Sequence, residues 1–341
     1  MTWPHRVEKY GLEEAIAITR FENKHRSSLV ALAEEYGLNC ELREVETVDA
    51  YFDQSTLDAG IAAAKAISEY VPELRYDLYS AGESKKQFRV SGDCVGAIVY
   101  DAAQLSSYKL VTQIFEVLVN EGINLQTETL VTKIDRPCDK SGWIVQTPRG
   151  SILARNIVHA TNGYAQYLLP PFDPLIKPTR GIMTAQLPSK SLSDPPLDRT
   201  YSFIYGSGEK FDYLIQQPPY DGNKLMLGGG LHQDPQPNTF DDGDVPISLQ
   251  SYLFNQLPKV LHWDNEGDVH RRLSMCWCGI MGFSKDELPW VGAVPENLGG
   301  GQGQWICAGY TGDGTSSTCL SDVRNDECVT LCGCGCDDGS W

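Results

Sequence analysis

The stretch from residue 105 to residue 163 constrains the fold most. Residues 105–120 repeat apolar side chains at helical spacing and end near Gly122, which predicts a helix. Short apolar runs bounded by turn residues follow, which predicts strands. They are residues 123–127, 130–134, 143–147, 151–153 and 156–161, the third and fourth forming a hairpin around Pro148-Arg149-Gly150. A helix, strands, a hairpin and another strand are typical of an α/β fold.

The N-terminal third is predicted to be mainly helical. Residues 11–36 place apolar side chains on one helical face, and Gly37 suits the position after a helix end. Residues 57–71 show a second helical pattern that stops at Pro72. Short strands are expected at residues 41–45 and 95–100.

The pattern changes between residues 177 and 278, where strand-like runs alternate with loops rich in Pro, Gly and Asp. Residues 213–217 and 224–228 flank a turn at Asp221-Gly222, as expected for an antiparallel hairpin. We therefore expect an antiparallel sheet in a second, substrate-facing domain. The expected division is an incomplete nucleotide-binding, Rossmann-like part over 1–175, the antiparallel-sheet domain over 176–278, a return to the first part over 279–318, and a Cys-rich tail without regular structure over 319–341.

Composition excludes several classes of partner. The 341-residue chain carries a net charge of −17, which disfavours binding to nucleic acid and to anionic membrane surfaces. It has no run of eighteen apolar residues, and its first residues lack the apolar core of a signal peptide. Six of its eleven cysteines are scattered along the chain, as expected in a reducing compartment. A cytoplasmic location is therefore expected, with no membrane or nucleic-acid partner.

Four motifs occur in a characteristic order. An apolar strand ends in Ala160-Thr161-Asn162-Gly163-Tyr164, and Pro178-Thr179-Arg180-Gly181 follows. Residues 279–292 then read Gly-Ile-Met-Gly-Phe-Ser-Lys-Asp-Glu-Leu-Pro-Trp-Val-Gly, and residues 308–314 read Ala-Gly-Tyr-Thr-Gly-Asp-Gly. In this order the motifs resemble the D-amino-acid-oxidase-type FAD-dependent oxidoreductases, and most closely the fungal members of that group. The resemblance extends over residues 1–314.

The resemblance implies a reaction and a set of site residues. The substrate is an amine or amino acid whose α-hydrogen leaves as hydride to the flavin N5, with O2 as the usual acceptor. A side-chain base is not required if the amine enters neutral. Arg180 and Tyr213 lie in segments that face the substrate in relatives. The FAD-contacting positions implied by the match are Val131, Ala160, Thr161, Asn162, Gly163, Gly279, Ile280, Gly282, Gly309, Gly312 and Gly314.

Two departures from the family pattern bear on flavin binding. The family's opening Gly-x-Gly-x-x-Gly turn, which places the pyrophosphate on a helix N-terminus, has no counterpart among the early glycines Gly11, Gly37 and Gly60. Asp313 stands where relatives carry a histidine. We therefore expect a truncated chain that starts after the family's first βαβ unit and binds FAD weakly. A non-catalytic relative is the alternative function.

The cysteines suggest two further alternatives. Cys328, Cys332, Cys334 and Cys336 crowd the C-terminus. Such spacing can gather thiolates around zinc or copper(I), but no histidine lies nearby and no metal site is expected. Cys278 lies near the place where some family members attach flavin covalently, and a buried free thiol is the expected alternative. His159, inside an apolar strand, is expected to be a hydrogen-bonded core residue.

Overall fold

The computed structural model describes residues 3–138, 142–206, 210–264 and 271–312. Contacts between Cα atoms divide the chain into two compact units, each built from separate stretches of sequence. Unit 1 takes its described residues from Met1–Ile114, Gly181–Gln236 and Asp241–Gly279, and unit 2 takes its described residues from Phe115–Arg180, Pro237–Phe240 and Ile280–Trp341.

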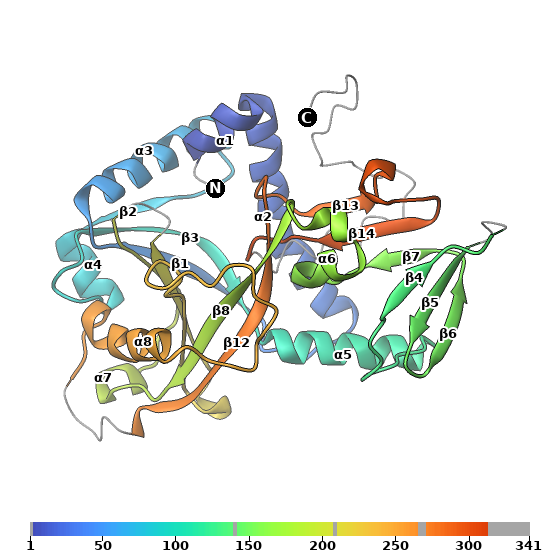
Figure 1. Ribbon diagram of the computed structural model, residues 1–341. Helices are drawn as coiled ribbons and strands as arrows, with labels where there is room; N and C mark the ends of the chain where they lie inside the picture. Colours follow the sequence, from blue (N-terminus) through green and yellow to red (C-terminus); the bar gives the residue numbers. More distant parts are fainter. Residues whose placement is uncertain (1–2, 139–141, 207–209, 265–270, 313–341) are drawn as a thin grey trace. The chain divides into compact units, whose positions relative to one another are not determined.

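An eight-stranded mixed sheet forms the centre of unit 1 (Figure 1). Its strand order is β12-β8-β11-β10-β9-β1-β3-β2. β1 pairs in parallel with β9 and antiparallel with β3, and the pairs β9–β10, β10–β11, β11–β8 and β3–β2 are antiparallel. The strands are β1 Arg43–Tyr51, β2 Asp77–Ser80, β3 Gly96–Gln104, β8 Ile176–Gln186, β9 Thr200–Ile204, β10 Phe211–Gln216, β11 Leu225–Gly228 and β12 Leu273–Ser284.

Around β1 this sheet is packed on both faces, and successive side chains of the strand point to opposite faces. Val48 and Ala50 of β1 join the main core, which also contains leucines of α8 (Ile247–Val260). Tyr51 of β1 points to the other face and packs with Leu57 of α3 (Gln54–Tyr70). Burying one leucine fully contributes roughly 1.5–3 kcal/mol, so the two layers hold the sheet between helices.

The helix ends of unit 1 show the local signals that the sequence contains. After α2 (Leu12–Glu35) the Gly37 N–H donates to the Glu34 carbonyl and the Leu38 N–H to the Ala33 carbonyl. Gly37 has φ 61°, so this is a Schellman motif, and the predicted role of Gly37 is confirmed. The remaining helices of unit 1 are α1 Trp3–Tyr10, α4 Ala81–Phe88, α7 Lys190–Ser193 and the 3₁₀ turn η3 Pro219–Asp221, and α5 Ser107–Asn120 runs on into unit 2.

Unit 2 contains two three-stranded sheets (Figure 1). One is an antiparallel meander of β4 (Lys133–Asp135), β5 (Trp143–Thr147) and β6 (Gly150–Ala154). In the other, β14 (Gln304–Ala308) pairs antiparallel with β13 (Trp290–Ala293) and in parallel with β7 (Ile157–His159). Short helical turns follow β7 and β13: η1 Asn162–Tyr164, α6 Ala165–Leu168, η2 Pro170–Phe172 and η5 Glu296–Leu298.

Most of the expected elements are present, and the mixed α/β class is confirmed. The strand expected at residues 123–127 is wrong, since this segment is irregular and its side chains are exposed. The strand expected from residue 130 begins only at Lys133. Among the described residues, no strand lies beside residues 123–127 to complete their backbone hydrogen bonds, which a short run needs.

The grouping of elements differs from the expected division in the N-terminal half. β1, β2 and β3 lie in the same sheet as the antiparallel strands of residues 181–236, so the first 114 residues belong to unit 1. A separate finding is that no helix of the described residues is long and apolar enough to cross a membrane.

Candidate functional site

Three of the sequence motifs meet in unit 2 at Asn162, directly after β7. The Asn162 backbone is left-handed, with φ 43°, a conformation that asparagine tolerates better than most residues. Its side-chain Oδ1 accepts hydrogen bonds from the backbone N–H groups of Gly309 at 3.0 Å and Tyr310 at 3.3 Å. One amide oxygen therefore joins the Ala-Thr-Asn-Gly turn to the Ala-Gly-Tyr turn.

Glycine is required where the third motif crosses this turn. A Cβ atom on Gly282 would lie 2.6 Å from Asn162 Oδ1 and 2.8 Å from the Gly163 nitrogen. A Cβ atom on Gly163 would lie 2.8 Å from the Met281 carbonyl oxygen. The two backbone segments are so close that only glycine, which has no Cβ atom, fits at positions 163 and 282.

Thr311 connects the motif of residues 308–314 to the motif of residues 279–292. Its N–H donates to the Gly282 carbonyl at 2.7 Å, and its Oγ1 accepts from the Ser284 N–H at 3.1 Å. We refer to Asn162, Gly163, Gly282, Gly309 and Thr311 as the glycine junction. The junction is a close, hydrogen-bonded crossing of three segments that are far apart in the sequence.

Two polar side chains lie close to the junction in the sequence. Thr161 Oγ1 is buried and has no hydrogen-bond partner among the described residues. His159 Nε2 lies 2.9 Å from Gln304 Nε2, and since an amide nitrogen only donates, this histidine nitrogen accepts. Burial lowers the His159 pKa, so the ring is a neutral, hydrogen-bonded core residue in this structure.

The other predicted site residues lie at varied places. In unit 2, Val131 is half-buried outside any strand, and Ala160 is exposed. Gly279 belongs to unit 1, and a Cβ atom there would meet nothing within 4 Å. Gly314, Asp313 and the Cys-rich tail lie outside the described residues. Ile280 lies on β12 two residues before the junction, and Gly312 directly follows Thr311. The flavin-contact role of every one of these residues stays a prediction.

The two candidate substrate residues belong to different units. Arg180 is buried in unit 2, where its guanidinium lies 3.4 Å from Thr239 Oγ1. Tyr213 of β10 is 38 % exposed on the face opposite the main core of unit 1. Its ring lies over Gly228 of β11, where a Cβ atom would be 2.5 Å from the ring carbons. The Phe211 ring lies beside it at 6.4 Å between centroids, so the sheet presents an aromatic surface here.

Sequence reasoning missed two buried carboxyl groups of unit 1. Burial raises the pKa of Asp49 to about 6, although the Tyr100 hydroxyl donates to Asp49 Oδ2 at 3.2 Å. Burial likewise raises the pKa of Asp212 to about 6 against hydrogen bonds that favour its charged form. An aspartate in a strand whose neighbouring positions are apolar, as in residues 47–51 and 211–216, is the signal that was available.

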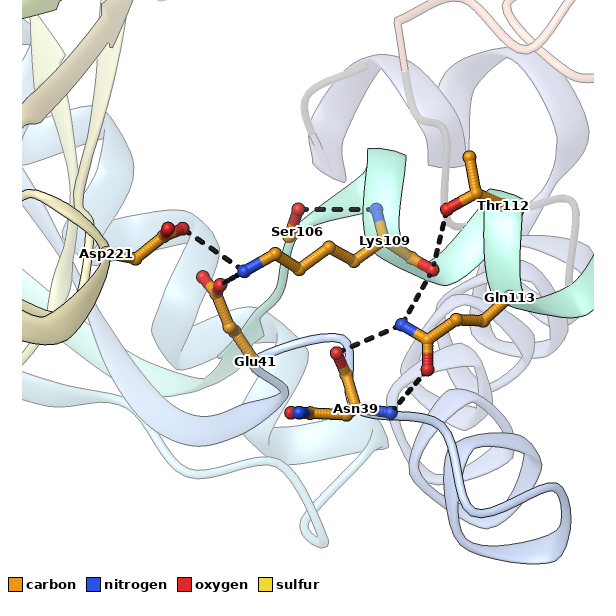
Figure 2. Close-up of polar contacts among 7 residues, drawn as sticks. All are labelled: Asn39, Glu41, Ser106, Lys109, Thr112, Gln113 and Asp221. Atoms are coloured by element: carbon orange, nitrogen blue, oxygen red, sulfur yellow. Dashed lines mark hydrogen bonds and ion pairs between the residues drawn. The ribbon is translucent and has the colours of Figure 1, made fainter.

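The first turns of α5 have a structural role (Figure 2). Gln113 accepts from the Asn39 N–H at 2.8 Å and donates to the Asn39 carbonyl at 3.0 Å. Lys109 forms ion pairs with Glu41 and, at 3.3 Å, with Asp221. These contacts attach the loop before β1 and the β10–β11 connection to the first turns of α5 (Figure 2).

Within the parts of the chain described here, no cluster of three or more His, Cys, Asp or Glu side chains is arranged to hold a metal ion. Cys278 Sγ lies 3.0 Å from the Asp242 carbonyl oxygen and is half-buried in unit 1. Covalent attachment of a flavin at Cys278 stays a hypothesis.

Several solved structures have the same fold as this chain. Glycine oxidase from Geobacillus kaustophilus superposes with a TM-score of 0.72 at 21 % identity, covering 89 % of this chain and 76 % of that chain. NikD, an unusual amino acid oxidase, gives 0.70 at 15 % identity, with 94 % and 82 % covered. L-α-glycerophosphate oxidase from Mycoplasma pneumoniae, solved with FAD bound, gives 0.67 at 13 % identity, with 89 % and 77 % covered.

The family itself is shown by the sequence match. Residues 3–321 match the family described as FAD dependent oxidoreductase (DAO). The fold described above and this match over most of the chain agree, and the chain belongs to the DAO family of FAD-dependent oxidoreductases.

Proposed function

We propose that this protein is an FAD-dependent oxidoreductase that oxidises a C–N bond of an amine or amino acid, with O2 as electron acceptor. The observation that carries the proposal is the glycine junction, where all three glycine-containing family motifs of unit 2 contact one another through Asn162. Glycine oxidase and an amino acid oxidase are among the proteins with the same fold, which supports the C–N substrate class.

The residues of the junction fit one half of the cofactor. The Cβ positions of Gly163 and Gly282 are filled by neighbouring backbone, so the turn is already rigid before any ligand arrives. Ala160 and Gly312 are exposed to solvent. The buried Thr161 hydroxyl has no hydrogen-bond partner among the described residues, so it can bond to a ligand. Residues 160–163 and 309–312 would hold the ring and ribityl part, and a bound flavin supplies the hydride acceptor at N5.

Arg180 of unit 2 and Tyr213 of unit 1 are each proposed, separately, as a residue that contacts the substrate. Arg180 is a buried cation suited to a carboxylate, and Tyr213 offers an aromatic face that stacks on the Gly228 backbone. The chain needs no general base for this step if the amine arrives neutral, because removal of a hydride, with the nitrogen lone pair forming the C=N bond, gives the iminium ion without prior loss of a proton. The role of the protein is then to orient the substrate and exclude water.

A second candidate function is a relative that binds FAD weakly and does not turn over. The printed sequence has no Gly-x-Gly-x-x-Gly turn to receive the pyrophosphate. It also has Asp313 at the position of the family histidine, where a negative charge disfavours an anionic reduced ring. These two features favour weak binding, while the junction favours a retained ring site.

The test is the visible absorption spectrum of the purified protein after incubation with FAD and desalting. A retained flavin spectrum supports the oxidoreductase, and an amine and amino-acid panel with peroxide detection, with L-α-glycerophosphate as an alcohol control, then selects the substrate class. A colourless protein after desalting supports the second candidate. Peroxide formed only from the alcohol would contradict C–N oxidation.

A further inference from the structure

A buried hydrogen-bond network in unit 1 centres on Asp212 of β10, which is inaccessible to solvent. Its Oδ1 accepts from the Gly230 N–H at 2.8 Å. Its Oδ2 accepts from the hydroxyl of Tyr252, in α8, at 2.7 Å and from the Tyr205 hydroxyl at 3.2 Å. Three donors and no cation among them surround the carboxylate, so its charge is held by hydrogen bonds alone.

Each tyrosine hydroxyl has a second partner. Gln256 Nε2 donates to the Tyr205 oxygen at 2.7 Å, and His232 Nε2 lies 3.2 Å from the Tyr252 oxygen. A hydroxyl carries one proton. Since Tyr252 gives that proton to Asp212, its oxygen must accept from His232, and the neutral imidazole therefore carries its proton on Nε2.

The other nitrogen of His232 then has a lone pair. His232 Nδ1 is buried and has no hydrogen-bond partner among the described residues, while the ring as a whole is partly exposed. Burial, followed by the charge of Lys210, lowers the His232 pKa, so the ring stays neutral near pH 7. The acceptor at Nδ1, on the partly exposed ring, is thus the end farthest from Asp212 in this chain of hydrogen bonds.

We propose that His232, Tyr252 and Asp212 form a proton relay that takes up a proton at His232 Nδ1 and stores it on Asp212. A proton that solvent delivers past the partly exposed ring binds Nδ1, the Nε2 proton passes to the Tyr252 oxygen, and the Tyr252 hydroxyl proton passes to Asp212 Oδ2. One proton enters, the aspartate becomes neutral, and histidine and tyrosine stay neutral. The histidine changes tautomer, and its Nδ1 turns from acceptor to donor.

The surroundings favour a single route. The Tyr205 hydroxyl accepts from the Gln256 amide and also lies against the Tyr252 hydroxyl. Because the amide has no proton to exchange at ordinary pH, Tyr205 stabilises Asp212 without leading to a second proton donor. The charged and titratable groups that face the relay are Lys210 near His232, and Tyr205 and Tyr213 near Asp212. Burial raises the pKa of Asp212 to about 6, which brings proton storage into the physiological range.

The proton-loaded state keeps the local backbone in place. Gly230 donates to Oδ1, whereas the stored proton lies on Oδ2, so this hydrogen bond is present in both states. A Cβ atom on Gly229 would lie 2.8 Å from the Asp212 Cα, so the turn after β11 is closely packed on Asp212. The relay therefore moves protons without moving this turn.

The experiment is a pH titration of the full chain labelled with ¹⁵N-histidine, in which the two ring nitrogens report the tautomer. The chain has six histidines, and the spectrum of His232→Gln assigns the signal. Above pH 7.5 we expect the Nε2–H tautomer. As Asp212 takes up its proton on acidification, we expect the neutral Nδ1–H tautomer to appear with the same midpoint.

Two tyrosine variants provide a matched pair. Tyr252→Phe and Tyr205→Phe each remove one hydroxyl donor from Asp212, and only the first interrupts the relay. We expect the tautomer change to vanish in Tyr252→Phe and to persist in Tyr205→Phe. An equal effect of the two variants, or an Nδ1–H tautomer in the wild type above pH 7.5, overturns the proposal.

Asp212→Asn gives a second test that does not depend on the tyrosine variants folding. The asparagine amide can accept from Gly230 and donates permanently to Tyr252, as the protonated carboxyl does. We expect the Nδ1–H tautomer of His232 at every pH above the histidine's own titration. Retention of the Nε2–H tautomer in this variant also overturns the proposal.

Discussion

Unit 1 and unit 2 bury their apolar strand residues to very different extents. In unit 1, Leu225 and Leu227 of β11 are completely buried in the core beneath the sheet. In unit 2, Leu153 of β6 is 71 % exposed and Val158 of β7 is 61 % exposed. These are apolar strand residues in both units, so the difference in exposure lies in what covers them.

The pairing of β7 with β14 shows where the cover is incomplete. Val158 pairs with Trp305, which is 41 % exposed, whereas the next pair, His159 and Ile306, is buried. One face of this sheet is therefore packed and the other carries apolar side chains to solvent. Exposed apolar strand faces and edge strands favour association with other chains, so we expect unit 2 to be the less stable and more aggregation-prone unit.

The largest expected effect compares leucines of the two units. Leu253→Ala in α8 opens a cavity in the main core of unit 1 and should lower the free energy of unfolding by about 2–5 kcal/mol. Leu153→Ala removes an exposed side chain and should change it by no more than about 0.5 kcal/mol. Native-state hydrogen exchange with mass spectrometry measures each unit separately. Equal losses would contradict the difference in burial.

The next effect concerns pH and belongs to unit 1, which contains both buried carboxyl groups with raised pKa values. The pKa of Asp49 is about 6 in the folded chain and 3.8 ordinarily, so the native state binds this proton more tightly. The stabilisation of the folded state by the proton on Asp49 is complete below pH 3.8 and is lost as pH rises to about 6 and above. Over this pH range Asp49 should change the free energy of unfolding by up to about 3 kcal/mol, and Asp49→Asn should remove that change.

The measurement for Asp49 is denaturant unfolding of wild type and variant at pH 4 and pH 7.5. The difference between the two proteins should change in favour of the variant on going to pH 7.5. Titrations of other groups cancel in this comparison, since both proteins share them. A difference that is the same at both pH values would show that Asp49 is not buried as the structure has it.

The glycine junction gives an effect of intermediate size in unit 2. Gly282→Ala places a methyl group against Asn162 and Gly163 and should destabilise the unit by about 1–3 kcal/mol. Gly279→Ala, three residues earlier on β12, meets open space and is the matched control. Thermal melting followed by intrinsic fluorescence compares the pair, and FAD retention after desalting is compared between Gly282→Ala and the wild type. Equal melting temperatures would argue against the close crossing.

The smallest expected effect on stability comes from changing an exposed valine, and a buried valine is the comparison. Val158→Lys puts a charge on the exposed face of β7 and should leave the melting temperature almost unchanged, because exposed substitutions change the free energy of unfolding by about 0.5 kcal/mol or less. It should reduce aggregation on heating, measured by light scattering. Val48→Lys, in the core of unit 1, is the contrasting variant and should prevent folding. Unchanged aggregation of Val158→Lys would mean that another surface drives association.

The sequence predicted the elements with strong local signals and missed those set by distant partners. α2 was located through its apolar spacing and Gly37, and the β10–β11 hairpin through alternation around Asp221-Gly222. The same reasoning failed at residues 123–127, where β-type residues have no strand to pair with. It also could not place β1 beside β9, since that pairing joins residues about 150 positions apart.

The candidate site was predicted in part for the same reason. The order of motifs identified Asn162, Gly163, Gly282 and Gly309, and the structure brings these four together. Sequence alone gave no indication that the Asn162 side chain makes the connection, because its two partners lie about 150 residues further on. Asp212 was missed for a related reason: its partners Tyr205, Tyr252 and Gly230 come from three different elements.

The parallel pairing of β1 with β9 has a consequence for synthesis of the chain. β1 ends at Tyr51, but its partner strand ends at Ile204 and the leucines of α8 that cover the sheet come after residue 246. A nascent chain leaving the ribosome therefore carries one bare edge of β1 while about 150 further residues are added. Such long-range pairing folds slowly and exposes intermediates, which makes unit 1 the unit expected to depend on holdase chaperones during translation.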